Sequence, residues 1–354
     1  MTRRHLRLAV MLVFAGLFFA LVVVQKSQTA RILIIHSNDP AYPWVASVNE
    51  GLARGFEGRR NILFRYHYMD LKNHTDAAFK ERAATLALNA VSSWAPDVLV
   101  LVDDEAQALV GKAVVAPGPG APGVRVVFSG VNGEPADYYP PGAEVTGILE
   151  RKPLPAIRDA ALSIALESAT RPPRARPRVQ FIGDHSSSIT AEIPTYEGFD
   201  WSPAEFLPPV QVDTFADWQA AVERAEREAD VILVTNYRNI RDGVDGPFLR
   251  PAAQVMQWTA EHATVPVIGM GATNSEDGAM LTVSVSPFEQ GEVAAALALQ
   301  VLDGTPPASL PVVVSKQFIV QVCTPSLARW GLTLPPLYEA FARATDHYYE
   351  EGCS

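Results

Sequence analysis

Short apolar runs that end in polar residues alternate with amphipathic segments along most of this chain. Residues 31–37 (RILIIHS), 97–102 (DVLVLV) and 125–129 (RVVFS) are three of these runs. Apolar residues recur at every fourth position from Trp44 to Phe56, which is the spacing of one helix face. Runs of this kind are typical of parallel strands buried on both faces. Their alternation with helices predicts βαβ units and a parallel sheet.

The same pattern restarts after residues 145–149, which we interpret as a strand that crosses to a second unit. Later strands are predicted over residues 179–183, 210–213, 231–235, 265–269 and 280–286, with a last extended piece over 312–322. Later helices are predicted over residues 154–168, 215–229, 251–262, 287–302 and 337–350. The sequence therefore predicts two Rossmann-like α/β lobes with parallel sheets, joined by more than one crossing of the chain.

A basic segment with Arg3, Arg4 and Arg7 precedes an uninterrupted apolar run over residues 8–24. This arrangement predicts export, with residue 31 onward outside the cytoplasm. The run is long for a signal peptide and near the lower limit for a membrane span, so a cleaved signal and an uncleaved anchor both remain open. The arginine cluster and the lack of a polar face argue against a buried core helix.

Composition excludes several classes of protein. Of the 354 residues, 48% are hydrophobic and 19% are charged, which excludes intrinsic disorder. The formal net charge of −10 argues against a nucleic-acid partner, because such a protein needs a basic face. The two cysteines, Cys323 and Cys353, are too few for a disulfide scaffold; they form one bridge in an oxidising compartment, or none.

The residues just after each predicted strand are rich in hydroxyl, amide and carboxylate groups. Open parallel sheets bind ligands beyond the carboxyl ends of their strands, so these positions predict a cleft for a small ligand. The candidate ligand-binding residues at these tips are Ser37, Asn38, Asp103, Asp104, Ser129, Asn132, Asp184, Ser187, Asn236, Tyr237 and Gly271. For any one of them, an ordinary solvated loop is the simpler interpretation.

Tyr42 and Trp44, in the segment YPW after the first strand, are two further candidates. Their rings offer a face for an aromatic or ammonium group, although Trp44 also falls on the apolar helix stripe. The acidic run from Asp103 to Glu105 stands where a strand ends and a helix begins. It either complements the positive end of that helix or supplies counter-charge for a cationic ligand.

Catalytic and cofactor motifs are weak. The run Gly118–Gly123 satisfies GxGxxG by letter, but its prolines and the lack of a following helix indicate a loop. Residues 184–186 (Asp-His-Ser) are consecutive, which disfavours a triad with the imidazole between its partners. His67, Asp70 and His74 have an irregular spacing for zinc. We predict no enzyme, no cofactor and no metal site.

Several longer segments resemble the extracytoplasmic substrate-binding proteins of ABC transporters with the type I periplasmic-binding fold, in the branch that includes aromatic-amino-acid binders. The segments that carry the resemblance are residues 34–43 (IIHSNDPAYP), 126–135 (VVFSGVNGEP), 145–148 (VTGI), 278–286 (GAMLTVSVS), Gly291 and 302–306 (LDGTP). The resemblance covers most of residues 31–333.

This resemblance implies a domain organisation. Residues 1–30 would be the signal or anchor, 31–145 with 287–309 lobe one, and 146–286 with 310–333 lobe two. A hinge of three crossings would join the lobes, and residues 334–354 would be a helical tail beyond the family pattern. The acidic run at Asp103 replaces a hydroxyl residue that relatives use for a ligand carboxylate, and Val322-Cys323-Thr324 replaces an asparagine.

The predicted function is a periplasmic or extracytoplasmic solute-binding protein that delivers a small polar or aromatic ligand to an ABC permease. Its partners would be that ligand, the permease and, through residues 8–24, the inner membrane. The alternative is a membrane-tethered sensor that reports its ligand to a signalling partner. An exported hydrolase is disfavoured because the catalytic motifs are weak.

Overall fold

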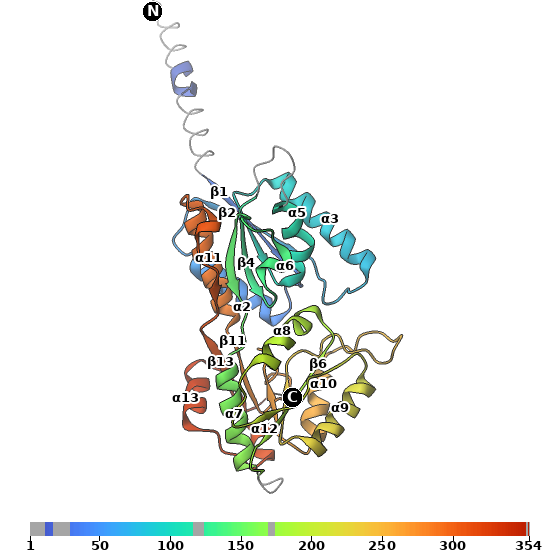
Figure 1. Cartoon of the computed structure of the whole chain (residues 1–354). Helices are drawn as coiled ribbons and strands as arrows, with labels where there is room; N and C mark the ends of the chain where they lie inside the picture. The colour runs from blue at the N-terminus through green and yellow to red at the C-terminus, as the bar shows by residue number, and fades with distance from the viewer. Residues whose placement is uncertain (1–10, 17–28, 116–123, 169–173, 352, 354) are drawn as a thin grey trace, which may run out of the picture.

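Two α/β lobes, drawn one above the other in Figure 1, make up the chain in a computed structural model. The structure describes residues 11–16, 29–115, 124–168, 174–351 and 353. Each lobe has one sheet whose strands are mainly parallel, so the predicted fold class is confirmed.

The predicted signal or anchor falls largely outside the described residues. Residues 11–16 of the apolar run form an exposed helical stretch. Among the residues that the structure describes, none of the helices combines the length and apolarity needed to cross a bilayer.

Lobe one is built on six parallel strands in the order β12-β5-β4-β3-β1-β2. Its strands are β1 (Ala30–His36), β2 (Ile62–Tyr68), β3 (Val98–Val102), β4 (Val126–Val131), β5 (Val145–Leu149) and β12 (Val313–Val314). Its helices are α2 (Pro43–Gly55), α3 (Ala77–Trp94), α4 (Asp104–Ala106), the π-helical turn η1 (Gln107–Gly111), α5 (Lys112–Val115), α6 (Pro135–Tyr138), α11 (Pro287–Leu302) and the 3₁₀ turn η2 (Pro307–Ser309).

Helices cover both faces of this sheet, which explains why β3 and β4 are buried throughout. α2 and α11 pack together on one face and α3 covers the other. Glycines allow the close approach of α2 and α11: a Cβ added at Gly51 or Gly291 would lie 2.0 Å from a backbone oxygen of the other helix. The late helix α11 is thereby fixed to lobe one, although the chain has passed through lobe two before reaching it.

The described residues of lobe two form eight strands, with β14-β13-β11-β10-β9-β6-β7 in order and β8 also paired to β6. These strands are β6 (Arg178–Asp184), β7 (Glu205–Phe206), β8 (Val210–Val212), β9 (Val231–Val234), β10 (Val267–Gly269), β11 (Leu281–Val285), β13 (Phe318–Cys323) and β14 (Tyr348–Tyr349). The helices are α7 (Leu154–Glu167), α8 (Ser187–Gly198), α9 (Phe215–Glu228), α10 (Ala253–His262), α12 (Thr324–Arg329) and α13 (Pro336–Ala344). Only the β11–β13 pair is antiparallel among the described strands.

The chain crosses between the lobes three times. The crossings follow β5, β11 and β12, and hydrogen bonds tie them together. The backbone N–H of Arg151 donates to Ser315 Oγ at 3.0 Å, and the Glu289 carboxylate accepts the backbone N–H groups of Lys316 and Gln317. The three crossing segments therefore form one connected hinge.

The strand pairings suggest lobe boundaries somewhat later than the sequence predicts. β5 pairs with β4, and β12 pairs with β5, so both strands lie in the sheet of lobe one. We propose that lobe one spans residues 30–150 with 287–315, and lobe two 151–286 with 316–353. The predicted limits after residues 145 and 309 would cut both strands away from their sheet.

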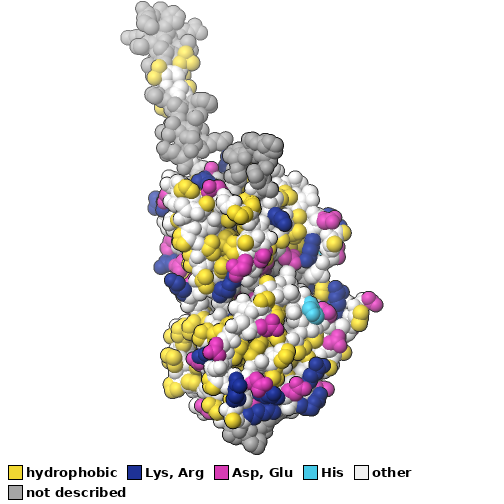
Figure 2. All heavy atoms as spheres, viewed as in Figure 1, with side chains coloured by type: hydrophobic (Ala, Val, Ile, Leu, Met, Phe, Trp, Pro, Cys, Tyr) yellow, Lys and Arg dark blue, Asp and Glu magenta, His cyan; other side chains and the backbone are white. Residues whose placement is uncertain are grey.

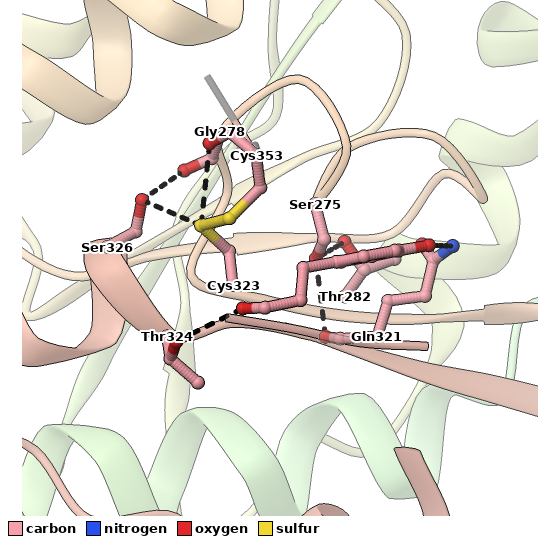
Figure 3. Close-up of a disulfide and its surroundings, with 9 residues drawn as sticks. Ser275, Gly278, Thr282, Gln321, Cys323, Thr324, Ser326 and Cys353 are labelled. Atoms are coloured by element: carbon pink, nitrogen blue, oxygen red, sulfur yellow. Dashed lines mark hydrogen bonds between the residues drawn. A yellow bond between two sulfur atoms is a disulfide. The ribbon is translucent and has the colours of Figure 1, made fainter. Parts of the chain in front are cut away.

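The C-terminal tail joins lobe two. The predicted helix over 337–350 is wrong in its second half, because the chain turns after α13 and adds β14 to the sheet beside β13. A disulfide between Cys323 and Cys353 closes this segment, and Ser326 donates to the backbone oxygen of Gly278 beside it (Figure 3). The pairing that the sequence left open is thus present in the structure.

Candidate ligand-binding cleft

Two adjacent chambers lie between the lobes, beyond the carboxyl ends of the parallel strands. Figure 2 shows charged side chains of both signs along the waist where the lobes meet. The inner chamber is a cavity of about 70 Å³ lined by Tyr42, Trp44, Lys72, Asp103, Asn132, Glu150, Lys152, Ser188, Ile189, Glu192, Thr235, Asn236, Arg238, Gly271, Ala272, Thr273 and Ser284. The outer chamber, of about 370 Å³, is lined by Ser37, Asn38, Leu71, Lys72, Thr75, Lys80, Asp103, Glu105, His185, Ser186, Ser187, Ser188, Asp213, Asn239, Arg241 and Phe248.

Asp103 lines both chambers. It follows β3 and has a backbone φ of 77°, in a region that residues other than glycine rarely occupy. One carboxylate oxygen accepts the backbone N–H of Asp104 at 2.8 Å, and the other accepts Asn38 Nδ2 at 2.7 Å. A backbone in such a region costs about 1–3 kcal/mol, and such costs concentrate at ligand sites. The unusual conformation therefore supports a ligand-facing role for Asp103.

Two cations from opposite lobes lie against the ring of Tyr42. Lys72 Nζ is 4.1 Å from the ring centroid, and the guanidinium carbon of Arg238 is 5.4 Å from it. Arg238 is also held by Asp277 at 3.1 Å and by Thr273 Oγ1 at 2.9 Å. Tyr42 thus links the two lobes through cation–π contacts at the wall of the inner chamber.

A buried group of three charges lines the inner chamber. Lys152 Nζ lies 2.8 Å from Glu150 Oε1 and 3.3 Å from Glu192 Oε1. Burial alone would lower the pKa of Lys152, but the two carboxylates raise it above its usual value. For Glu192, in contrast, burial is the main cause of a raised pKa. Its carboxylate accepts a hydrogen bond from the hydroxyl of Tyr196.

A hydrogen bond between a strand tip of lobe one and a helix of lobe two joins the lobes inside the chamber. Asn132 Nδ2, just after β4 of lobe one, donates to Glu192 Oε1 on α8 of lobe two at 2.7 Å. Both residues are buried. The cleft can therefore close through a contact between groups that also line the ligand cavity.

Nine of the predicted binding residues line the chambers. Tyr42, Trp44, Asp103, Asn132, Asn236 and Gly271 line the inner chamber, and Ser37, Asn38 and Ser187 join Asp103 in the outer one. Trp44 also belongs to the apolar helix stripe, as the alternative interpretation held, because it is buried in the core. Its ring occupies the space that a Cβ atom on Gly130 would need. The structure thus brings together residues from six separate segments of the chain.

Asp104 and Ser129 line neither chamber. Asp104 is turned into lobe one, where it accepts the backbone N–H of Gly133 at 2.9 Å and the hydroxyl of Tyr138 at 2.8 Å. Burial, with a smaller effect from the charge of Asp103, raises its pKa to about 6. Ser129 is buried and donates to the backbone oxygen of Gln290.

Asp184 and Tyr237 likewise have structural roles in lobe two. The Asp184 carboxylate accepts the backbone N–H groups of Ser186 and Asn239, both at 3.0 Å. The hydroxyl of Tyr237 donates to Asp277, the carboxylate that also pairs with Arg238. These residues shape the loops that carry the cleft.

Five charged residues of the inner chamber were not predicted from the sequence: Lys72, Glu150, Lys152, Glu192 and Arg238. Glu192 lies on α8, a helix that was not predicted, and Arg238 lies two positions beyond the strand-end residue Asn236. Lys152 lies in a crossing between lobes. A search of the crossing segments for charged residues would have found Glu150 and Lys152.

The weak catalytic motifs do not assemble. His185 pairs with Asp213 at 3.0 Å, and the Ser186 hydroxyl accepts from Asn236, so the imidazole does not lie between Asp184 and Ser186. Within the described part of the chain no three His, Cys, Asp or Glu side chains are grouped to hold a metal ion. The glycine motif at residues 118–123 lies outside the described residues.

Residues 206–343 match the model of the family described as ABC transporter substrate binding protein. This match confirms the predicted family resemblance. No curated protein is similar enough in sequence to count as a relative of this chain.

Solved structures resemble this chain over most of its length. A conserved domain protein from Vibrio cholerae O1 biovar El Tor has a TM-score of 0.64 at 18% identity, covering 88% of this chain and 98% of that one. An ABC domain from Streptococcus pneumoniae in complex with L-Trp has a TM-score of 0.63 at 13% identity, covering 88% and 98%. A solute binding protein from Clostridium phytofermentas with bound L-rhamnose has a TM-score of 0.54 at 14% identity, covering 85% and 98%. These similarities show a shared type I periplasmic-binding fold.

Proposed function

We propose that this protein is the substrate-binding component of an ABC transporter, and that it captures a small polar or aromatic solute between its lobes. The cavity whose lining comes from both lobes carries this proposal. The family match supports transport over the signalling alternative. Relatives of the same fold bind L-Trp and L-rhamnose, which supports a small organic solute as the class of ligand.

The inner chamber suits a ligand with several polar groups. Its charges balance, with three basic side chains (Lys72, Lys152, Arg238) and three acidic ones (Asp103, Glu150, Glu192). A zwitterion or a neutral polar molecule therefore enters without leaving a net buried charge. Amide groups of Asn132 and Asn236, one from each lobe, add donors and acceptors on opposite walls.

The protein acts by binding and by closure of the lobes, and performs no reaction in this proposal. The crossings after β5, β11 and β12 act as the hinge. Closure brings Asn132 against Glu192, and release reverses that contact. An ABC permease then receives the solute.

The folded lobes work outside the cytoplasm. ABC substrate-binding proteins are extracytoplasmic, and the Cys323–Cys353 disulfide is the kind of bond that persists in oxidising compartments. Residues 1–30 direct export and, in this proposal, anchor the protein to the inner membrane through residues 8–24.

Tryptophan fluorescence tests the proposed function, because Trp44 lines the inner chamber. We expect one class in a panel of amino acids, nucleobases, nucleosides and sugars to produce a saturable change. The Trp44→Phe variant should reduce that change.

Asp103→Asn should weaken binding, and Glu81→Gln, on the exposed surface of α3, is its control. No saturable change from any class, together with no compaction in small-angle scattering, contradicts the proposal.

A further inference from the structure

Arg238 of lobe two contacts Tyr42 of lobe one across the cleft, so its position affects how the lobes meet. The guanidinium carbon lies 5.4 Å from the centroid of the Tyr42 ring, within the range of a cation–π contact. On its own side, the guanidinium donates to Asp277 at 3.1 Å and to Thr273 Oγ1 at 2.9 Å. Both acceptors lie in residues 270–280, which form the β10–β11 loop. The shape of this loop therefore determines where Arg238 lies.

The β10–β11 loop, all of which the structure describes, consists of turns without a helix or strand, so side-chain contacts must fix its shape. In the first half, Asn274 Oδ1 accepts the backbone N–H of Gly271 at 2.7 Å. The Nδ2 group of Asn274 donates to the backbone oxygen of Thr235 at 2.9 Å. These contacts fasten the first half of the loop to the end of β9. Asp277 lies in the second half, beyond their reach.

The disulfide between Cys323 and Cys353 closes residues 324–353 into one segment, hereafter the C-terminal segment. Both cysteine side chains are buried. Within this segment, the short strand β14 pairs with β13 through Tyr348 and Tyr349. Chain ends are poorly ordered unless a contact ties them down, and the disulfide provides that contact here. It therefore helps to keep Tyr349 in place.

The C-terminal segment contacts the second half of the β10–β11 loop. The hydroxyl of Ser326, in α12, donates to the backbone oxygen of Gly278 at 2.8 Å (Figure 3). The hydroxyl of Tyr349, in β14, lies 3.5 Å from Oε1 of Glu276. Glu276 and Gly278 are the two sequence neighbours of Asp277. The segment therefore contacts the loop on both sides of the carboxylate that holds the guanidinium.

Tyr349 also separates two carboxylates that compete for the same cation. Burial, with a smaller effect from the charge of Asp277, raises the pKa of Glu276. The hydroxyl of Tyr349 faces Glu276, whereas Asp277 faces the guanidinium of Arg238. Without that hydroxyl, Glu276 has no phenol to hold it away from the cation. Arg238 would then have two alternative partners and a less defined position.

We propose that the C-terminal segment positions Arg238, through Asp277, and thereby favours the closed arrangement of the lobes against Tyr42. Ser326 and Tyr349 are then positioning residues, because neither lines a chamber and both act on the contact between the lobes. This inference rests on the lobe closure of the proposed function. It does not depend on the identity of the solute.

Spin labels on the two lobes test this inference, because the distance between them reports closure without any solute. The labels are nitroxides on Glu81→Cys in α3 and Glu223→Cys in α9, both exposed positions of the full chain. Double electron–electron resonance should show that Ser326→Ala lengthens the mean distance by more than about 2 Å, the scale of a domain rearrangement. Ser92→Ala, which removes a serine hydrogen bond to a backbone oxygen in α3, is the matched control and should leave the distance unchanged.

A pair of tyrosine variants separates positioning of the loop from general support of lobe two. Tyr349→Phe should lengthen the distance between the labels, whereas Tyr338→Phe should not. Tyr338 also lies in the C-terminal segment, but its hydroxyl donates to the backbone oxygen of Ala156 at 3.1 Å, outside the β10–β11 loop. Equal lengthening by both variants would contradict the inference.

A double-mutant cycle tests whether the effect acts through Arg238. Arg238→Ala alone should lengthen the distance, and adding Ser326→Ala should then lengthen it no further. The inference is wrong if Ser326→Ala does not change the distance, or if it lengthens the distance equally with and without Arg238. Either result leaves the transport proposal standing, because solute binding in the fluorescence panel decides that proposal.

Discussion

The two lobes share an architecture but contribute different groups to the cleft. Lobe one offers residues that directly follow its strands, among them Asn38, Asp103 and Asn132. Lobe two offers strand-end residues such as Asn236, and also residues farther from its strands, such as Glu192 on α8 and Arg238 in the loop after β9. Strand tips have their positions fixed by the sheet, whereas helix and loop side chains depend on tertiary packing. Each lobe supplies three charged side chains to the inner chamber, but those of lobe two come from a crossing segment, a helix and a loop and not from strand tips.

The outer edges of the two sheets also differ. In lobe two the C-terminal tail adds β14 beyond β13 and is closed by the disulfide. In lobe one β2 is the edge strand, with Leu63 and Phe64 partly exposed. The tail therefore stabilises one lobe alone, and its loss should lower the stability of that lobe alone.

The largest effect on stability is expected at the buried charges Glu150, Lys152 and Glu192 that line the inner chamber. Lys152→Ala leaves Glu150 and Glu192 buried without their shared cation, which should reduce the free energy of unfolding by about 3–5 kcal/mol. Urea unfolding at neutral pH measures this loss. The control is Lys112→Ala on the exposed side of α5, which should change little. Equal effects of the two substitutions would show that the buried cluster does not stabilise the fold.

Loss of the disulfide should weaken lobe two and leave lobe one unchanged. The bond joins residues 30 positions apart. Cys323→Ala with Cys353→Ala should therefore cost about 3.5 kcal/mol by loop-closure entropy. Hydrogen exchange should speed up in α12, α13 and β14, while β1 and β3 keep their protection. Faster exchange in β1 and β3 as well would contradict the independence of the two lobes.

Asp104 should make stability depend on pH. Its pKa is raised to about 6 from an ordinary 3.8, so the native state keeps a proton that the unfolded state has released. Its contribution is therefore fully present below the ordinary pKa and is lost as pH rises through about 6, at most about 3 kcal/mol.

The comparison of wild type with Asp104→Asn isolates this contribution. Wild type should lose stability relative to the variant in urea unfolding between about pH 4 and about pH 7. Parallel curves for the two proteins would contradict the assignment. Because Asp104 lines neither chamber, Asp103→Asn should affect solute binding more than Asp104→Asn does.

The hydrogen bond between the lobes should have the smallest effect on stability. Asn132→Ala removes the hydrogen-bond donor to Glu192. It should reduce the free energy of unfolding by about 2 kcal/mol, which is typical of a hydrogen bond to a charged group. The variant should also be more open, and small-angle scattering should report a larger radius of gyration. Asn89→Ala is the control on exposed α3. An unchanged radius would show that this contact does not hold the lobes together.

The parts of the fold that follow from local pattern were predictable. Strands such as β3 and β4 are continuous apolar runs, and their burial on both faces follows from that pattern. The helix α8 escaped prediction because it contains Pro194 and only three of its residues are buried, so its apolar periodicity is weak. The register of β14 depends on a tertiary contact with β13 that no local pattern encodes.

The candidate site, too, was predictable where it follows from local pattern and not where it depends on tertiary contacts. Asp103 and Asp104 are neighbours with the same chemistry, yet the positive φ of Asp103 turns one toward the chambers and the other into lobe one. Strand-end position predicted both as ligand-binding residues, but only Asp103 lines the chambers. Arg238 is held at the inner chamber by tertiary contacts with Tyr42 of the other lobe, Asp277 and Thr273, which no local pattern encodes.

A crystal structure with the solute that the binding panels identify tests the central claim most directly. The account predicts that the solute lies between the lobes and contacts Asp103 of lobe one together with Asn236 or Arg238 of lobe two. A solute bound to one lobe alone, or outside the space between the lobes, would contradict it.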